Sequence, residues 1–370
     1  MRIGIDARPF KYKEFSGIPE SVYRILQEWM EHHPEHEYDL ISNSEICLPC
    51  TLPPNWHKVI RPDHSGNGTL WMLFRLPGII RERSLDVFWG TNYMLPAKVQ
   101  GCSYVVSVYD LAFVRYPQVS SRKTLLALKL FSKSACKKAD LIHTISQSTA
   151  KDVEELYRIQ PEKIRTVYLG GPESKTQKAV PVSIEIQGRY FLFLSTIEPR
   201  KNPVLVLKAY QLFCDRFGDD IQLVFAGKHG WNLEQFDQCL VEHPYRNRIH
   251  LLGYISPKEK NRLLAHAEAL LYPSLYEGFG LPLLEAMSFG TTVVTSRVSS
   301  MPEVAGEAAL YIENTASDEQ LCRRMQDAVT MSESDREQLR RKMEQNLKRF
   351  RWSTCADQLM QCMTELVSFS

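Results

Sequence analysis

The stretch LYPSLYEGFGLPLLEAMSFG, residues 271–290, decides the fold because it joins a strand to a helix through a glycine-rich turn. The apolar run ALLYPS at its start predicts a buried strand of a parallel sheet. Pro282 suits the first turn of a helix, where its missing N–H costs no hydrogen bond, so we expect the helix to begin near Leu281. Gly278 and Gly280 then form the turn at the carboxyl end of the strand, where open α/β sheets bind ligands.

Two glutamates, Glu277 and Glu285, lie around this turn. A helix N-terminus attracts anions, and glycines let a ligand approach the backbone closely. Carboxylates repel phosphate but accept hydrogen bonds from hydroxyls. A nucleotide sugar meets both requirements, so we predict Glu285 on the ribose diol, Glu277 near the hexose, and the amides of residues 278–281, which include Phe279, near the sugar and phosphate. For an isolated pair at this spacing, two solvated carboxylates beside an ordinary turn are an equally good interpretation.

The same alternation of strand and helix patterns runs along the whole chain, which predicts parallel strands joined by crossover helices. With 370 residues the chain is too long for one ordinary core. The polar segment 171–188 has no clear period and predicts a linker. We therefore expect an α/β protein of two doubly wound, Rossmann-like, parallel-sheet domains, the first over residues 1–175 and the second over residues 188–349.

Residues 350–370 carry a final amphipathic pattern that predicts a terminal helix. Its apolar stripe packs either on its own domain or on the first domain, and the spacing leaves both open. The stripe consists of Ala356, Leu359, Met363 and Leu366.

The composition is that of a soluble globular protein, with 44% apolar and 24% charged residues. A net charge of +2 argues against nucleic-acid binding by charge alone. Nine scattered cysteines, an odd number, argue against a disulfide scaffold and for a reducing compartment. With no signal-peptide pattern and no apolar run of membrane-spanning length, we expect a cytoplasmic protein, with peripheral binding at the inner membrane face left open.

A diphosphate ligand needs positive charge, and the segment STIEPRKNP places Arg200 and Lys201 directly after an apolar strand. Arginine offers a two-pronged donor and lysine a point charge for phosphate oxygens. Because no convincing Asp-x-Asp motif is present, we expect these cations and the amides, rather than a metal, to neutralise the diphosphate. Gly17, before Pro19, predicts a second anion-binding helix start. A surface Arg–Lys pair and an ordinary turn are the alternatives.

Several segments together resemble the large group-1 family of retaining glycosyltransferases (family 4), which has the GT-B fold of two such domains with an interdomain cleft. The resemblance covers essentially the whole chain, in order and spacing. The segments are RIGIDARPF, SVYDLAFVRYP, ADLIHTISQSTAKDV, STIEPRKNP, VFAGKHG, HLLGYIS, YEGFGLPLLEAMSFG, TTVVTSRVSSMPEVAGEAALYI and FRWSTCADQL.

The resemblance implies transfer of a hexose from a nucleoside-diphosphate sugar, which is a substrate rather than a cofactor, to a hydroxyl with retention. The first domain binds the acceptor, the second binds the donor, and the terminal helix returns to the first. Arg200 and Lys201 would hold the diphosphate, and Glu277 would position and stabilise. The backbone of residues 253–255, which are Gly253, Tyr254 and Ile255, would line the base pocket. GDP-mannose is favoured because the pattern is most similar to polysaccharide mannosyltransferases, with UDP-glucose and dTDP-rhamnose left open.

One position departs from the family pattern. Family members often carry a histidine before the aspartate of this motif, whereas this chain has Tyr109 before Asp110. Tyrosine can form hydrogen bonds but is bulkier and uncharged at neutral pH. We interpret Tyr109 as shaping the pocket for a different donor. Two alternatives remain: a nucleotide-sugar 2-epimerase, and a non-catalytic nucleotide-sugar-binding partner of another transferase.

Two charged clusters remain. Residues 121–138 predict a helix with a basic stripe that could lie on an anionic membrane surface, hold the diphosphate of a lipid-linked acceptor, or simply be solvated. The stripe consists of Arg122, Lys129, Lys133 and Lys137. His32, His33 and His36, near the end of the first helix, are expected to be solvated and to lack metal-ligand spacing.

Overall fold

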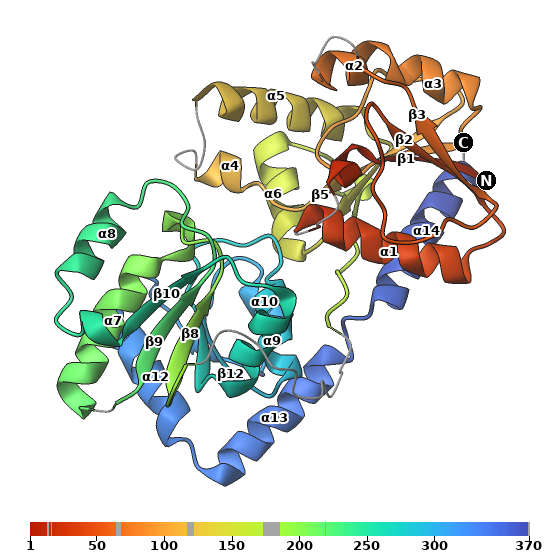
Figure 1. Ribbon diagram of the computed structural model, residues 1–370. Coiled ribbons are helices and arrows are strands. Elements are labelled where there is room, and N and C mark those ends of the chain that lie inside the picture. The colour runs from red at the N-terminus through yellow and green to blue at the C-terminus, as the bar shows by residue number, and fades with distance from the viewer. Residues whose placement is uncertain are drawn as a thin grey trace. The chain divides into compact units, whose positions relative to one another are not determined.

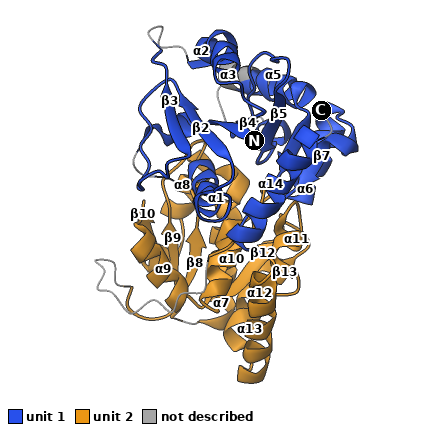
Figure 2. Ribbon diagram, turned by 90° about the vertical axis from the view of Figure 1, so that its right-hand side faces the viewer, with its two compact units in different colours: residues 1–170, 350–370 blue, residues 171–349 orange. Residues whose placement is uncertain are grey.

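The computed structural model describes residues 1–12, 15, 17–63, 68–116, 122–172, 186–218 and 220–368. The chain divides into two compact units (Figure 2). Unit 1 contains residues 1–170 and 350–370, and unit 2 contains residues 171–349. Most of the expected linker, residues 173–185, lies outside the described part of the chain.

Unit 1 is built on a parallel sheet whose seven described strands have the order β3-β2-β1-β4-β5-β6-β7. All of its neighbouring strands pair in parallel. Every residue of the inner strand β5 is buried, as expected where helices cover both faces of a sheet. The strands are β1 (Arg2–Asp6), β2 (Glu37–Ser42), β3 (Trp56–Ile60), β4 (Val87–Gly90), β5 (Ser103–Val108), β6 (Leu141–Thr144) and β7 (Ile164–Thr166).

The helices of unit 1 follow the strands as the alternating pattern predicts. Helix α5, Arg122–Lys138, matches the helix expected over residues 121–138, except that residue 121 lies outside the described part of the chain. The helices are η1 (Arg8–Lys11), α1 (Ile18–His32), α2 (Gly68–Phe74), α3 (Leu76–Glu82), α4 (Ala112–Arg115), α5 (Arg122–Lys138), α6 (Gln147–Tyr157), η3 (Pro161–Lys163) and α14 (Trp352–Ser368).

The terminal helix α14 belongs to unit 1, where it packs along α1 (Figure 1). The indole Nε1 of Trp29 donates a buried hydrogen bond of 2.9 Å to the carbonyl of Ala356. The chain also passes Gly170 so closely that an added Cβ there would lie 2.4 Å from the ring of Trp352. Of the two packings that the sequence leaves open, the structure therefore has the return to the first domain.

Unit 2 has a second parallel sheet, with six described strands in the order β10-β9-β8-β11-β12-β13. The chain runs outward from β8 through β9 to β10 and then returns to place β11 on the other side of β8. The loops after β8 and β11 therefore meet at the point where the strand order reverses, the usual ligand site of such sheets. The strands are β8 (Tyr190–Leu194), β9 (Gln222–Ala226), β10 (Ile249–Gly253), β11 (Ala269–Tyr272), β12 (Thr292–Ser296) and β13 (Leu310–Ile312).

The helices of unit 2 complete the second doubly wound arrangement, so the predicted fold class is confirmed for both units. Among the described residues, none of the helices combines the length and apolar character needed to cross a membrane. The helices of unit 2 are η4 (Pro199–Lys201), α7 (Pro203–Phe217), α8 (Glu234–Val241), η5 (Arg246–Arg248), α9 (Pro257–His266), α10 (Leu281–Ser288), α11 (Met301–Ala305), α12 (Asp318–Thr330) and α13 (Glu333–Leu347).

Candidate active site

The glycine-rich turn joins β11 to α10, and the helix begins at Leu281 as predicted. Gly280 is the N-cap with a φ of 115°, a conformation that favours glycine. Two serines before α11 hydrogen-bond to the backbone of the turn. Ser300 Oγ lies within hydrogen-bond distance of the carbonyls of Phe279 (2.7 Å) and Glu277 (3.0 Å). Ser299 Oγ donates to the Glu277 carbonyl at 2.6 Å. These contacts hold the backbone around Glu277 in one shape.

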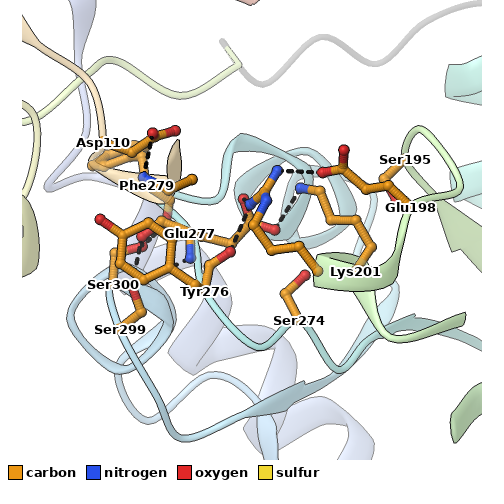
Figure 3. Close-up of polar contacts among 12 residues, drawn as sticks. Asp110, Ser195, Glu198, Lys201, Ser274, Tyr276, Glu277, Phe279, Ser299 and Ser300 are labelled. Atoms are coloured by element: carbon orange, nitrogen blue, oxygen red, sulfur yellow. Dashed lines mark hydrogen bonds and ion pairs between the residues drawn. The ribbon is translucent and has the colours of Figure 1, made fainter. Parts of the chain in front are cut away.

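A buried charge cluster lies at the switch point of unit 2 (Figure 3). Glu277 Oε1 pairs with Lys201 Nζ at 2.5 Å, and its Oε2 pairs with Arg200 Nη1 at 3.0 Å. The other prong of Arg200 binds Glu198 Oε1 at 2.5 Å, and Nη1 also donates to the carbonyl of Tyr276 at 2.6 Å. The four charged side chains, which we call the switch-point cluster, are between 6% and 14% exposed.

Burial and charge oppose each other within this cluster. Burial alone would raise the pKa of Glu277, but the charges of Lys201 and Arg200 outweigh it and hold the pKa at about 2. Burial lowers the pKa of Lys201 more than Glu277 raises it. The Tyr272 hydroxyl accepts a hydrogen bond from Lys201 Nζ at 2.9 Å. With two cations and two carboxylates, the cluster has no formal net charge. Its two cations can bind an incoming anion in place of the carboxylates.

Glu285 is not part of the switch-point cluster. It lies on α10 and forms an ion pair with Lys260 of α9, where both side chains are partly exposed. At the end of β10, Gly253 has a φ of 67°, Tyr254 is exposed with Lys228 Nζ 4.9 Å from its ring centroid, and Ile255 is buried. The structure thus brings Arg200, Lys201 and Glu277 together, and it places Glu285 on α10 and residues 253–255 at the end of β10.

The predicted residues of unit 1 have local structural partners. Asp110 Oδ1 accepts a hydrogen bond of 2.9 Å from the Ala112 amide at the start of α4, and the Asp110 amide donates to Tyr93 Oη at 3.1 Å. Gly17 is the N-cap of α1 with a φ of 64° and a ψ of −123°. An added Cβ at Gly17 would have no neighbour within 4 Å, so the backbone conformation, and not crowding, calls for glycine there.

Tyr109 is almost completely buried, which raises the pKa of its hydroxyl. Among the described residues this hydroxyl has no hydrogen-bond partner at normal geometry. Ser107, two residues earlier, is already engaged, because its Oγ accepts from Trp89 Nε1 at 2.9 Å and lies 2.8 Å from His143 Nδ1. Burying a hydroxyl costs free energy unless it is hydrogen-bonded.

Sequence reasoning missed several members of this site. Glu198 stands in the quoted segment STIEPRKNP, and a carboxylate beside two cations was a visible signal of pairing. Tyr272 stands in the predicted strand ALLYPS, and Ser299 and Ser300 stand in the segment TTVVTSRVSSMPEVAGEAALYI, where no local signal indicates their contacts. Lys260 gave no signal, because nothing in its own segment indicates a contact with Glu285.

Two doubly wound units, with a charge cluster at the switch point of the second, define a GT-B-type protein. Residues 175–350 match the family described as glycosyl transferases group 1, and residues 8–171 match glycosyltransferase family 4. Together the two matches cover residues 8–171 and 175–350, so the chain belongs to the group-1, family-4 glycosyltransferases.

The relatives agree with this assignment. The chain is 31% identical over 243 residues to O-antigen chain mannosyltransferase B of Escherichia coli, covering 63% of each chain. It is 26% identical over 242 residues to O-antigen chain mannosyltransferase RfbU of Salmonella typhimurium, covering 65% of this chain and 64% of that one. The matched region thus spans less than two thirds of each relative's own length.

Solved structures share the fold across nearly the full length. The crystal structure of WaaG, a glycosyltransferase involved in lipopolysaccharide biosynthesis, aligns with a TM-score of 0.70 at 18% identity, covering 98% of this chain and 100% of that one. Sucrose-phosphate synthase from Thermosynechococcus elongatus aligns with a TM-score of 0.72 at 16% identity, covering 100% of both. At these identities the likeness concerns the fold.

Proposed function

We propose that the protein transfers a hexose, with GDP-mannose as the favoured donor, to a hydroxyl of a glycan or lipid-linked acceptor in surface polysaccharide synthesis. Transfer proceeds with retention and without a metal. The names of the curated relatives support mannose and a polysaccharide product. The single observation that carries the proposal is the buried switch-point cluster of Arg200, Lys201, Glu198 and Glu277 at the carboxyl ends of β8 and β11.

The chemistry follows from the charges of this cluster. Arg200 and Lys201 bind the diphosphate. The negative charge of the diphosphate then replaces that of Glu198 and Glu277, which pair with these cations before the donor enters. Once its cations turn to phosphate, the Glu277 carboxylate accepts hydrogen bonds from sugar hydroxyls and stabilises positive charge developing on the hexose. No side chain acts as a nucleophile: the acceptor hydroxyl attacks on the face of the leaving group, and the β-phosphate takes the proton.

The remaining donor contacts come from helix α10 and from the end of β10 in unit 2. Glu285 exchanges Lys260 for the ribose diol, and the backbone of residues 253–255 lines the base. The amides of residues 278–281 lie near the sugar and phosphate. Unit 2 is the donor-binding domain in this proposal, and unit 1 is the acceptor-binding domain, to which Tyr109, Asp110 and Gly17 belong.

Turnover by the purified protein tests the proposal. We expect sugar transfer from GDP-mannose to an acceptor lipid extract in the presence of EDTA, with the anomeric configuration of the donor kept in the product. Release of a 2-epimer without acceptor would favour the epimerase, and binding without hydrolysis or transfer would favour the non-catalytic partner. Parallel reactions with UDP-glucose and dTDP-rhamnose identify the donor.

The role proposed for Tyr109 has its own test. Tyr109→His introduces the residue common in the family and removes a buried hydroxyl that has no hydrogen-bond partner among the described residues. If Tyr109 selects the donor, the relative turnover of mannosyl, glucosyl and rhamnosyl donors changes in the variant. An unchanged preference would assign Tyr109 to packing alone.

We also propose that helix α5 binds an anionic membrane surface. Lys129, Lys133 and Lys137 share one helix face with Leu126 and Leu130, which are 61% and 62% exposed. Cations beside exposed leucines suit a membrane interface, where each basic residue contributes about 1 kcal/mol. The side chain of Arg122 lies outside the described residues.

Vesicle sedimentation tests this surface. We expect binding to anionic vesicles at low salt that is lost on adding salt, and weaker binding by a Lys129→Gln, Lys133→Gln, Lys137→Gln triple variant. Absence of binding at low salt would leave α5 a solvated basic helix.

A further inference from the structure

The loop that follows α1 gathers three side chains of metal-ligand type. His33, Glu35 and His36 each offer one ligand atom, and these atoms lie within 4.8 Å of one another. The expectation that both histidines are solvated is wrong, because the side chains of His33 and His36 are only 18% and 13% exposed. Only His32 is exposed as predicted. Two largely buried imidazoles beside a carboxylate need polar partners to offset the loss of water.

The distances fit a small, tetrahedral metal ion. Glu35 Oε1 lies 3.4 Å from His33 Nδ1 and 3.3 Å from His36 Nε2. Zinc binds imidazole nitrogen and carboxylate oxygen at about 2.0–2.2 Å, so neighbouring ligands of a tetrahedral site stand about 3.3–3.5 Å apart. The distances from the carboxylate oxygen to the two imidazole nitrogens thus equal the separation expected between two ligand atoms of one zinc ion.

The loop is held in this shape by contacts that need no metal. Tyr38 Oη donates to the carbonyl of His33 at 2.9 Å. Asn55 Nδ2 donates to the carbonyls of Pro34 at 3.2 Å and His36 at 2.7 Å. The backbone carrying all three ligands is therefore fixed by neighbouring strands, which lowers the cost of ordering a site on binding.

A carboxylate of the terminal helix orients the first ligand. Asp357 Oδ1, on α14, lies 2.9 Å from His33 Nε2. A metal-bound histidine commonly donates its second ring N–H to a carboxylate, which fixes the tautomer and leaves the other nitrogen's lone pair for the metal. Here that nitrogen is Nδ1, the one facing Glu35. The Met1 ammonium, 3.5 Å from His36 Nδ1, can only donate to that nitrogen, and this contact favours the tautomer with the proton on Nε2. Binding of a metal ion through Nε2 moves the proton to Nδ1, so it must break the contact with the ammonium.

We propose that His33 Nδ1, Glu35 and His36 Nε2 bind a zinc ion, with water in the fourth position and Asp357 as a positioning residue. Imidazole and carboxylate ligands suit zinc among the available divalent metals. Because His33 follows α1 and Asp357 lies on α14, the ion strengthens the attachment of the returning helix within unit 1. The site is separate from the switch-point cluster, and its role is structural.

Metal titration of the full chain tests the site. After treatment with chelator, Zn²⁺ is titrated in competition with a chromophoric chelator, and we expect one tight equivalent per chain. Glu35→Gln, at a largely exposed side chain, leaves the fold intact and lowers the affinity at least 10-fold. Asp357→Asn lowers it about 10- to 100-fold through His33. His57→Gln is the matched control, since it removes an exposed histidine paired with Glu37 in the same unit, and leaves the affinity unchanged.

Cobalt substitution gives an independent readout. Co²⁺ in a tetrahedral site absorbs strongly in the visible range, and we expect that spectrum in the wild type and its loss in Glu35→Gln. A wild type that binds no Zn²⁺ in competition, or binds it equally well in Glu35→Gln and the His57→Gln control, would overturn the proposal and leave an ion-paired histidine cluster.

Discussion

Glu277 keeps its charge in a buried site because Lys201 and Arg200 compensate for the lost water. Its folded-state pKa of about 2 lies below the ordinary value of 4.5, so ionisation stabilises the fold fully above about pH 5, and this stability is lost as the pH falls toward 2. Glu277→Gln leaves Lys201 without a carboxylate partner and Arg200 with Glu198 alone, and we expect a loss of about 3–5 kcal/mol at neutral pH.

Urea unfolding across this pH range measures the effect. The difference between wild type and Glu277→Gln should shrink as the pH falls from 5 to 2. Glu319 is the matched control, because its hydrogen bonds to Arg216 and Arg323 also hold its pKa at about 2, but in solvent. Exposed pairs contribute little, so Glu319→Gln should change stability only slightly at any pH. A Glu277→Gln deficit that does not vary with pH would contradict this account.

Arg200 is the second residue with a sharp prediction, because its fork binds two carboxylates at once. Lysine keeps the charge but loses the paired geometry. We expect Arg200→Lys to lower kcat/KM for the donor by about 100-fold, a loss of about 2.7 kcal/mol of transition-state stabilisation. Arg297→Lys, at an exposed pair with Glu313 in the same unit, should leave kcat/KM unchanged. Equal kinetics in both variants would remove Arg200 from the site.

Among elements, the turn between β11 and α10 depends on the segment before α11. Ser300 is fully buried, and Ser300→Ala leaves the carbonyls of Phe279 and Glu277 without this donor. We expect a loss of about 1–3 kcal/mol in unfolding free energy, together with weaker donor binding. Ser288→Ala, which removes a bond to a carbonyl within α10, should cost less than half as much. Comparable losses of unfolding free energy in the two variants would show that the turn does not depend on the Ser300 hydrogen bonds.

The attachment of α14 gives a second element-scale prediction. Gly170→Ala places a Cβ 2.4 Å from the Trp352 ring and 2.6 Å from its backbone nitrogen, and we expect a loss of at least about 1–3 kcal/mol in unfolding free energy. Gly78→Ala in α3 meets nothing within 4 Å and should be neutral or stabilising by up to about 1 kcal/mol. Thermal melts of the two variants should therefore shift in opposite directions or differ clearly. A Gly170→Ala melt equal to wild type would contradict the close packing.

The elements were predictable where the sequence pattern is periodic. The start of α10 at Leu281 and the span of α5 follow from local signals that need no distant partner. Contacts between distant segments were not predictable: the pairing of Glu285 with Lys260 depends on how α9 and α10 pack. The burial of His33 likewise depends on Asp357, 324 residues away, which no local pattern reveals. The catalytic roles of the predicted residues remain predictions.

At the scale of the whole molecule, a net charge of +2 conceals a local arrangement in which buried cations and carboxylates balance. Such a balance keeps the switch-point cluster neutral, and in the proposed function its cations bind the diphosphate of the donor. We therefore expect the donor to bind unit 2 through Arg200 and Lys201.

Calorimetric titration of the full chain with GDP-mannose tests this claim most directly, with UDP-glucose and dTDP-rhamnose alongside. Lys201→Met keeps an unbranched side chain, one heavy atom shorter, and removes its charge, while Arg216→Met removes an exposed cation from the same unit. We predict that the preferred donor binds the wild type and the Arg216→Met control equally, and Lys201→Met at least 10-fold more weakly. Equal affinity in a folded Lys201→Met protein, or no binding of any donor to the wild type, would contradict the account.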